Sequence, residues 1–327
     1  MPRSLFDSKQ NCQTLICALL LMSAFVAACN KAPSPPEPAI APAAVTSSGV
    51  EPEFEQRLKT ICEGAQGTVG LSIVHIESGK TISINGATQL PLYSVFKLPL
   101  AVAVLKHVEE NRLRLDQQIH VVPEEIVPGT PENTALWQKP VDRTIEELIE
   151  FSISRSDNTS TEKLLQLAGG PASVTERMRS LGFKNLDIHS TISEYVKTRA
   201  NPNTGAAEDL ANLLTKLHQG KILLPAQLNV LIEFMRRAET GLHRIRGNLP
   251  PGTVVADKTG SGEKDAYTQV AKATNDVGII TLPGNRGHLA IAVLVSQSKL
   301  PDAAQEKLIA EIARAAYDAY SDHSSQN

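Results

Sequence analysis

Three short strings, widely separated along the chain, contain the residue types that acyl transfer needs. They are Ser94-Val95-Phe96-Lys97, Ser156-Asp157-Asn158 and Lys258-Thr259-Gly260. They supply a hydroxyl nucleophile with an amine one helical turn away, a second hydroxyl with an amide, and a lysine at the end of a strand. A lone S-x-x-K match carries little weight, because that pattern occurs three more times in the chain. The ordered set of three predicts a covalent serine mechanism.

Ser94 stands where a loop meets an apolar segment that is predicted to be helical from Ser94 to Glu110. Its backbone N–H would lie among the unpaired donors of a helix start, where developing negative charge is favoured. Lys97 would share a helix face with Ser94. A base must be neutral, and burial together with a second ammonium, for which Lys258 is the candidate, would lower the pKa of Lys97. Alone, the string would be interpreted as a helix cap followed by a solvated lysine.

The second string lies between two predicted helices, on a short loop that can project side chains into a cleft. We expect Ser156 to relay a proton toward a leaving nitrogen and Asn158 to contact a substrate amide. Asp157, between two inward groups, is expected to brace the loop. An ordinary helix cap of the Asx type is the alternative for this string.

The third string ends a β-branched segment, at what we expect to be an edge strand. Lys258 and Thr259 would meet a substrate carboxylate, and Gly260 would let the substrate backbone approach closely. The backbone N–H of Ser261, together with that of Ser94, would form an oxyanion hole.

The elements around these strings predict one α/β domain. Strands are expected near both ends of the domain and helices in the middle, which favours an antiparallel sheet flanked by terminal helices with an inserted all-helical lobe. The α/β lobe would span about 51–88 and 239–327, and the helical lobe about 89–238. The expected strands are Thr68–Ile76, Thr81–Ile84, Thr253–Thr259, Tyr267–Ala273, Asp276–Leu282 and His288–Ser296. The expected helices are Glu51–Ala65, Ser94–Glu110, Thr144–Ser152, Thr159–Ala168, Pro171–Leu181, Ala206–Gln219, Pro225–Ala238 and Asp302–Tyr320.

The N-terminus is typical of an export signal. Basic residues precede an apolar run that is too short to span a membrane, so 1–28 is interpreted as a signal peptide. Val26-Ala27-Ala28-Cys29 is similar to a lipobox, which predicts lipidation of Cys29 and anchoring to a membrane in the periplasm; a plain secretory signal is the alternative. Residues 29–50 are rich in proline and alanine and are expected to be an extended tether.

Composition excludes several other classes. The formal net charge of −3 and the absence of a basic cluster argue against a nucleic-acid partner. The eight histidines show no metal-ligand spacing, so neither a metal nor another cofactor is expected. Cys62 is the one cysteine of the mature domain, and its apolar helical face predicts a buried structural thiol rather than a disulfide. Nothing marks an oligomer, and we expect a monomer.

With these residues assembled, the chain resembles a class A serine β-lactamase, over about Phe54 to Tyr320. The segments around Ser94, before Lys258 and at Ala273-Thr-Asn-Asp-Val-Gly-Ile add to the likeness. The resemblance implies that a β-lactam acylates Ser94 and that an activated water then hydrolyses the acyl-enzyme.

In that family a glutamate on a long loop activates the water, usually with an asparagine four residues later. Glu194 matches best by position, but Thr198 stands four residues on, and the loop is short. Asn201 or Asn203 could replace the missing asparagine, and a solvated loop carboxylate is the alternative for Glu194.

Two residues outside the strings are further candidates. Arg244 matches a position where some family members hold the substrate carboxylate, with Arg246 or a plain surface charge as alternatives. Trp137 could wall the cleft or simply pack in the core.

Two other functions are kept as alternatives. One is a penicillin-binding protein or D,D-peptidase that acylates but deacylates slowly, and the other is a tethered, non-catalytic binding domain.

Overall fold

The computed structural model describes residues 45–48, 51–268 and 270–321. The signal peptide expected over 1–28, Cys29 and most of the tether expected over 29–50 lie outside the described residues. Part of the tether range is nevertheless a strand, because β1 (Val45–Ser48) pairs with β3 (Thr81–Ile84). No described helix has the length and apolarity that crossing a membrane requires.

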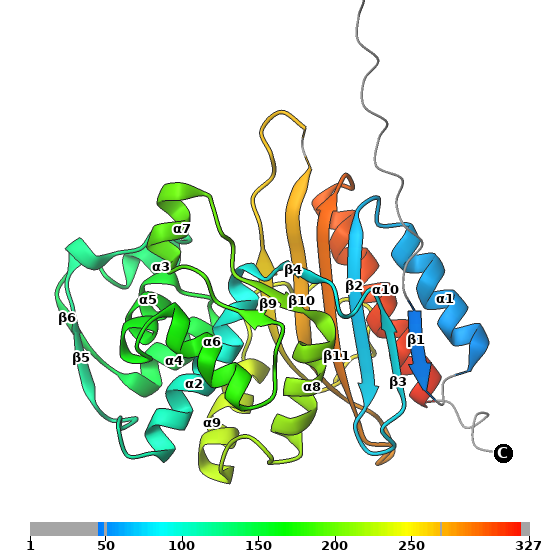
Figure 1. Ribbon diagram of the computed structural model, residues 1–327, viewed down its shortest axis with the longest axis horizontal. Helices are drawn as coiled ribbons and strands as arrows, with labels where there is room; N and C mark the ends of the chain where they lie inside the picture. The colour runs from blue at the N-terminus through cyan, green and yellow to red at the C-terminus, as the bar shows by residue number, and fades with distance from the viewer. Residues whose placement is uncertain (1–44, 49–50, 269, 322–327) are drawn as a thin grey trace, which may run out of the picture. The chain divides into compact units, whose positions relative to one another are not determined.

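An antiparallel sheet of six strands forms the right half of Figure 1, in the order β1-β3-β2-β11-β10-β9. Its last three strands in the chain are antiparallel neighbours in the sheet, and the sheet ends at β9, which is an edge strand as expected. The remaining strand bounds are β2 (Thr68–His75), β9 (Val255–Ser261), β10 (Ala271–Thr281) and β11 (His288–Ser298).

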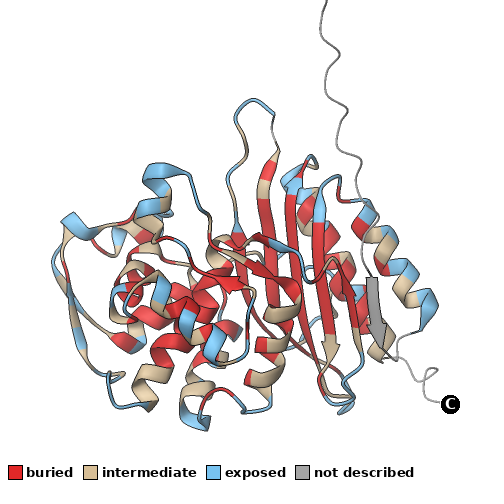
Figure 2. Ribbon diagram, viewed as in Figure 1, coloured by how far each residue is buried: buried red, intermediate tan, exposed pale blue. Residues whose placement is uncertain are grey.

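Each face of the sheet contributes to a different core, because side chains alternate along a strand. Along β11, Ala290, Ala292 and Leu294 join the core shared with the central helices. Leu289 and Ile291 join the second core, which the terminal helices α1 (Pro52–Glu63) and α10 (Asp302–Ser321) cover. Figure 2 shows the central strands buried along most of their length.

The middle of the chain is a cluster of helices around α2 (Lys97–Glu109), whose first nine residues are all buried. A helix that is apolar on every side has to lie inside the protein. The other helices of this region are α3 (Pro131–Ala135), α4 (Ile145–Ser154), α5 (Asn158–Leu167), α6 (Pro171–Ser180), α7 (Ile192–Thr198) and α9 (Pro225–Arg236).

The fold class is therefore confirmed, with four corrections of detail. Helix α8 (Ala207–His218) was assigned to the helical lobe but packs against β2 and β11, since its apolar stripe lies against the sheet. The separate strands expected at Tyr267–Ala273 and Asp276–Leu282 are wrong, because β10 runs unbroken from Ala271 and Tyr267 lies in an exposed turn. Helix α7 was expected to be loop. Short strands missed by the pattern are β4 (Gln89–Pro91), β5 (Gln118–Val121), β6 (Val141–Thr144), β7 (Leu186–Asp187) and β8 (Thr204–Ala206).

Candidate active site

Ser94 lies in a 3-10 turn, Tyr93–Phe96, that leads directly into α2. The helix was expected to begin at Ser94 and instead begins at Lys97. Tyr93 has a φ of +47°, a left-handed conformation that is uncommon for a residue with a side chain. Such local strain concentrates at functional sites, and here it directs the turn that carries Ser94.

Lys97 is fully buried, and its ammonium nitrogen is surrounded by oxygen atoms of the second string. Nζ donates to the carbonyl oxygen of Ser156 at 2.6 Å and to Oδ1 of Asn158 at 2.9 Å. It also lies 3.2 Å from Oγ of Ser156. Burial, reinforced by the nearby charge of Lys258, holds the pKa of Lys97 well below its usual value. The lowered pKa favours the neutral amine, the form in which Lys97 could act as a base.

The second string is bent by Ser156, whose φ is +56°. Asp157 caps α5: Oδ2 accepts the backbone N–H of Ser160 at 2.7 Å and its hydroxyl at 2.6 Å, while Oδ1 accepts the indole N–H of Trp137 at 3.3 Å. Asp157 thus braces the loop, as expected. Trp137 is almost fully buried, which favours packing over a place at the cleft mouth. The side chain of Asn158 is fixed by a second hydrogen bond, since its Nδ2 donates to the carbonyl of Pro128 at 2.6 Å.

Lys258 joins the third string to the second. It is fully buried, and its Nζ donates to Oγ of Ser156 at 3.2 Å and to the carbonyl of Thr259 at 2.8 Å. The hydroxyl of Ser156 therefore lies between two lysine nitrogens, each 3.2 Å away. Burial, with help from the charge of Arg244 and against the effect of Asp257, lowers the pKa of Lys258 to about 7. The arrangement can pass a proton from one amine to the other through Ser156.

Gly260 lies directly against the turn that holds Ser94. A Cβ placed on Gly260 would be 2.4 Å from the carbonyl oxygen of Leu92 and 3.1 Å from the backbone nitrogen of Ser94. The sequence argument reserved this glycine for substrate, but the close approach is made by the protein's own backbone. Ser261, the next residue, lines the same pocket as Ser94, so both oxyanion-hole candidates reach the same space.

Arg244 lies beneath the end of β9. Its guanidinium donates to the carbonyl of Gly260 at 3.2 Å and to Oγ of Ser261 at 2.7 Å, and it pairs with Glu306 at 3.2 Å. Arg246, the alternative, is half-buried and forms an ion pair with the buried Asp257. Arg244 is thus the cation that adjoins the site, whereas Thr259 shares a 2.6 Å hydrogen bond with Thr240.

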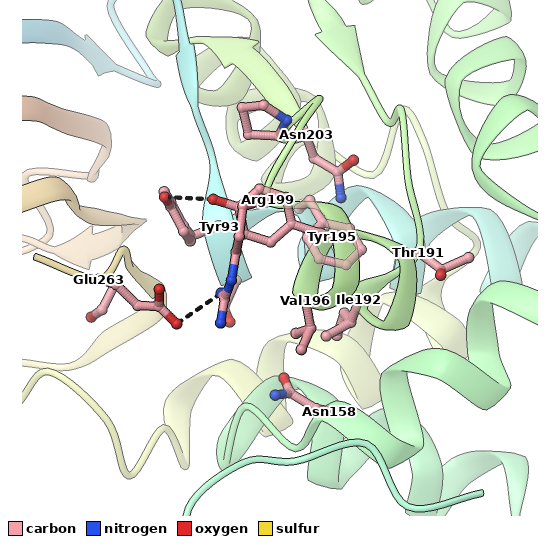
Figure 3. A pocket seen from close by; sticks show the side chains of 13 residues that line it. Tyr93, Asn158, Thr191, Ile192, Tyr195, Val196, Arg199, Asn203 and Glu263 are labelled. Atoms are coloured by element: carbon pink, nitrogen blue, oxygen red, sulfur yellow. Dashed lines mark hydrogen bonds and ion pairs between the residues drawn. The ribbon is translucent and has the colours of Figure 1, made fainter. Parts of the chain in front are cut away.

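The pocket in front of Ser94 is walled by α7 and by the hairpin that leaves β9. Figure 3 shows two bridges across it: the hydroxyls of Tyr93 and Tyr195 lie 3.0 Å apart, and Arg199 pairs with Glu263 at 2.8 Å. These four residues were not found from the sequence. Only Tyr93, as the neighbour of Ser94, carried any signal.

Glu194 is not brought to this pocket. The α7 residues that line it are Ile192, Tyr195 and Val196, whose spacing defines one helix face, and Arg199 follows directly after the helix. Glu194, two positions after Ile192, lies on the opposite face and is exposed. Its carboxylate accepts the backbone N–H of Thr191 at 2.8 Å, in a capping box that starts α7. The structure therefore does not bring Glu194 to the pocket, and its exposed position is the one expected of a solvated carboxylate.

The two asparagines considered with Glu194 have different places. Oδ1 of the buried Asn203 accepts the backbone N–H groups of His189 at 2.8 Å and Ser190 at 3.1 Å, and the residue lines the pocket. The carbonyl of Asn201 accepts the hydroxyl of Ser190 at 3.1 Å. Both tie together the two ends of the segment that carries α7.

Comparison with known proteins shows the family to which the chain belongs. A family model described as "Beta-lactamase enzyme family" matches residues 53–320. The extended-spectrum beta-lactamase PER-1 of Pseudomonas aeruginosa is 32% identical over 83% of this chain and 88% of that protein. A crystal structure of a beta-lactamase from Chitinophaga pinensis is similar with a TM-score of 0.78 and 35% identity, covering 82% of this chain and 99% of that one. The TLA-1 extended-spectrum beta-lactamase is similar with a TM-score of 0.79 and 32% identity, covering 83% of this chain and 99% of that one. The chain therefore belongs to the class A serine β-lactamase family and is a hydrolase.

Proposed function

We propose that the protein hydrolyses β-lactams through an acyl-enzyme formed on Ser94. The observation that carries the proposal is the chain of contacts from Lys97 through Ser156 to Lys258, beside a serine whose backbone adjoins β9. Oγ of Ser94 attacks the lactam carbonyl carbon and its proton passes to the neutral amine of Lys97. The negative oxygen is stabilised by the backbone N–H groups of Ser94 and Ser261.

Opening of the ring needs a proton on the departing nitrogen. The ring C–N bond breaks, and the proton taken from Ser94 returns to the nitrogen through the hydroxyl of Ser156. Lys258 and Arg244 supply positive charge on the β9 side, where an anionic substrate carboxylate would be placed. No cofactor takes part.

Hydrolysis of the acyl-enzyme ester is the step for which this site offers the fewest groups that could activate a water. Among the described residues that line the pocket, the one carboxylate is Glu263, and it is paired with Arg199. We therefore assign Lys97 as the base for both acylation and deacylation. A water adds to the ester carbonyl, the ester C–O bond breaks, and Ser94 regains its proton. We infer that this second half is slow.

Slow deacylation is also the property of the second candidate, a penicillin-binding or D,D-peptidase-like enzyme. The position of Glu194 on the outer face of α7 is the observation that favours it. Intact mass of the protein, followed with a chromogenic cephalosporin, separates the two. Sustained product release supports the hydrolase, and an adduct that persists without product supports the second candidate. Neither adduct nor product refutes acylation at Ser94, and Ser94→Ala provides the blank.

Variants of α7 test the inference about the slow step. Glu194→Gln is expected to leave product release unchanged, because its carboxylate serves the helix cap. Ile192 and Val196 point toward Asn158 in Figure 3, so Ile192→Glu would place a carboxylate at the site. We expect it to shorten the lifetime of the adduct at least about 100-fold, the low end of general-base catalysis, while Ile192→Gln does not. An adduct that is already short-lived in the wild type contradicts slow deacylation.

We propose further that Cys29 is lipidated, that the enzyme is anchored to a membrane in the periplasm, and that it acts as a monomer. The support is the lipobox-like Val26-Ala27-Ala28-Cys29 and the proline-rich stretch after it. Incorporation of labelled fatty acid in the wild type and its loss in Cys29→Ala is the expected result. A mature mass without acyl chains would favour a plain secretory signal, and light scattering of the detergent-free domain reports the oligomeric state.

A further inference from the structure

A cluster of nitrogen and oxygen ligands lies at the far end of the sheet from Ser94. Glu77, His218 and His288 each direct one ligand atom into the same small space, and these atoms all lie within 4.8 Å of one another. They come from three separate segments: the turn between β2 and β3, the last residue of α8 and the first residue of β11. None of them takes part in the site described above.

The cluster is remote from the reaction. His288 pairs with Thr281 at one end of the β10–β11 hairpin. Asn275, which pairs with Gly260 beside the nucleophile, lies six residues away along β10. Because a strand rises about 3.3 Å per residue, about 20 Å separates the two levels of the sheet. The lower ends of β2 and β11 are side by side in Figure 1, as their pairing requires.

The carboxylate of Glu77 is held in place by His288. Oε1 lies 2.7 Å from Nδ1 of His288, and Oε2 accepts the backbone N–H of the same residue at 2.8 Å. Gly287 makes room for it, since a Cβ there would be 2.1 Å from Oε2, and its φ of +95° suits glycine. A backbone adapted to one carboxylate gives that ligand a fixed position.

His218 completes the cluster from α8. Its Nε2 is 4.0 Å from Oε1 of Glu77, and its ring lies 4.0 Å from the ring of His288 at an angle of 43°. A third nearby histidine, His75, has both ring nitrogens engaged, by Ser78 at 2.7 Å and by the carbonyl of Arg286 at 2.8 Å. It is therefore not available as a ligand.

We propose that Glu77, His218 and His288 bind a divalent late first-row cation, Zn²⁺ by preference, at a structural site. Two imidazoles and a carboxylate are ligands that this ion favours, with nitrogen and oxygen at about 2.0–2.2 Å. Tetrahedral ligands at those distances stand about 3.3 Å apart. Oε1 of Glu77 lies 2.7 Å from Nδ1 of His288 and 4.0 Å from Nε2 of His218, so the two distances lie on either side of that value. Small side-chain rotations therefore bring the atoms into place, with water as the fourth ligand.

The bound ion cross-links α8 to both strands on which it packs. Because it binds the folded chain and not the unfolded one, it raises the melting temperature in proportion to the logarithm of its free concentration. It touches neither substrate nor the acylated serine, so turnover at saturating substrate stays the same.

The test uses the full chain, stripped of metal with a chelator, and ZnCl₂ alone as the probe. Isothermal titration and thermal unfolding are expected to show one Zn²⁺ per chain and a higher melting temperature. His218→Gln and His288→Gln are each expected to weaken binding at least about tenfold, because losing a ligand costs no less affinity than losing one of its outer-shell partners. His120→Gln is the matched control, because His120 also lies 2.7 Å from a carboxylate, that of Asp142, but among the described residues this pair belongs to no group of three metal-binding side chains.

Three outcomes overturn the proposal: no binding at tens of micromolar Zn²⁺, equal affinity in all three variants, or a melting temperature that does not respond to the metal. If His288→Gln fails to fold, His218→Gln alone tests the proposal. The side chain of His218 is partly exposed at the end of α8, so its replacement is expected to leave the fold intact. Loss of binding in His120→Gln would equally refute the assignment.

Discussion

The close packing of Gly260 against the turn that holds Ser94 predicts the effect of one added methyl group. In Gly260→Ala the new Cβ would be 2.4 Å from the carbonyl oxygen of Leu92. An ordinary C···O contact is about 3.3 Å, so the end of β9 and the turn that holds Ser94 must separate by about 0.9 Å. The backbone nitrogen of Ser94, 3.1 Å from the same Cβ, is displaced with that turn. A misplacement of about 1 Å costs roughly 100-fold in rate.

The quantity to measure is the rate of adduct formation on Ser94, followed by rapid quench and intact mass. Gly278→Ala is the matched control, because its Cβ would be 2.7 Å from the carbonyl of Ala256, on the same strand pair but away from the nucleophile. Both variants are expected to lose about 1–3 kcal/mol of stability from overpacking, but only Gly260→Ala loses acylation. A folded Gly260→Ala that acylates within threefold of wild type, or an equal loss in the control, refutes the reasoning.

Three further predictions concern buried groups. Because the folded-state pKa of Lys258, about 7, is below its unfolded value, the folded state binds fewer protons above pH 7 and stability rises with pH there. In urea unfolding, the free energy of unfolding of the wild type should rise by up to about 1.4 kcal/mol per pH unit, and that of Lys258→Met should lack this rise. Equal pH slopes for the two proteins would contradict the lowered pKa of Lys258. Asp157→Ala leaves buried donors on Ser160 and Trp137 unpaired, and should cost about 3 kcal/mol by urea unfolding; a loss below 1 kcal/mol would be inconsistent with the brace. Burial raises the pKa of Cys62 to about 12, so native protein at pH 8 should resist thiol reagents that react in urea.

Local sequence patterns predicted those helices and strands that are specified by residues close together in the chain. The β2–β3 hairpin, the terminal helices and the start of α4 rest on periodicity, turn residues and caps, which act over a few residues. Cys62 is confirmed as buried for the same reason, since its helical face is apolar. The capping box from Thr191 to Glu194 could have revealed α7 in the same way, because its signal is local.

Relations between distant segments were not predictable in this way. Arg199 and Glu263 have no sequence feature that pairs them, and α8 has an amphipathic pattern that is compatible with either core. Position along the chain suggested Glu194 for the pocket, but the orientation of α7 presents Ile192 there instead. A shift of two residues around a helix moves a side chain to the other face, and only tertiary packing determines which face is inward.

The sequence by itself determined the chemistry of acylation. A serine, two lysines, a second serine and an asparagine in three ordered strings restrict the mechanism to a covalent one, since few other reactions need that set. The tertiary structure decided how those groups meet and what surrounds them. Burial, which no linear pattern records, lowers the pKa of both lysines, and the packing of α7 and β9 decides which groups can reach the acyl-enzyme.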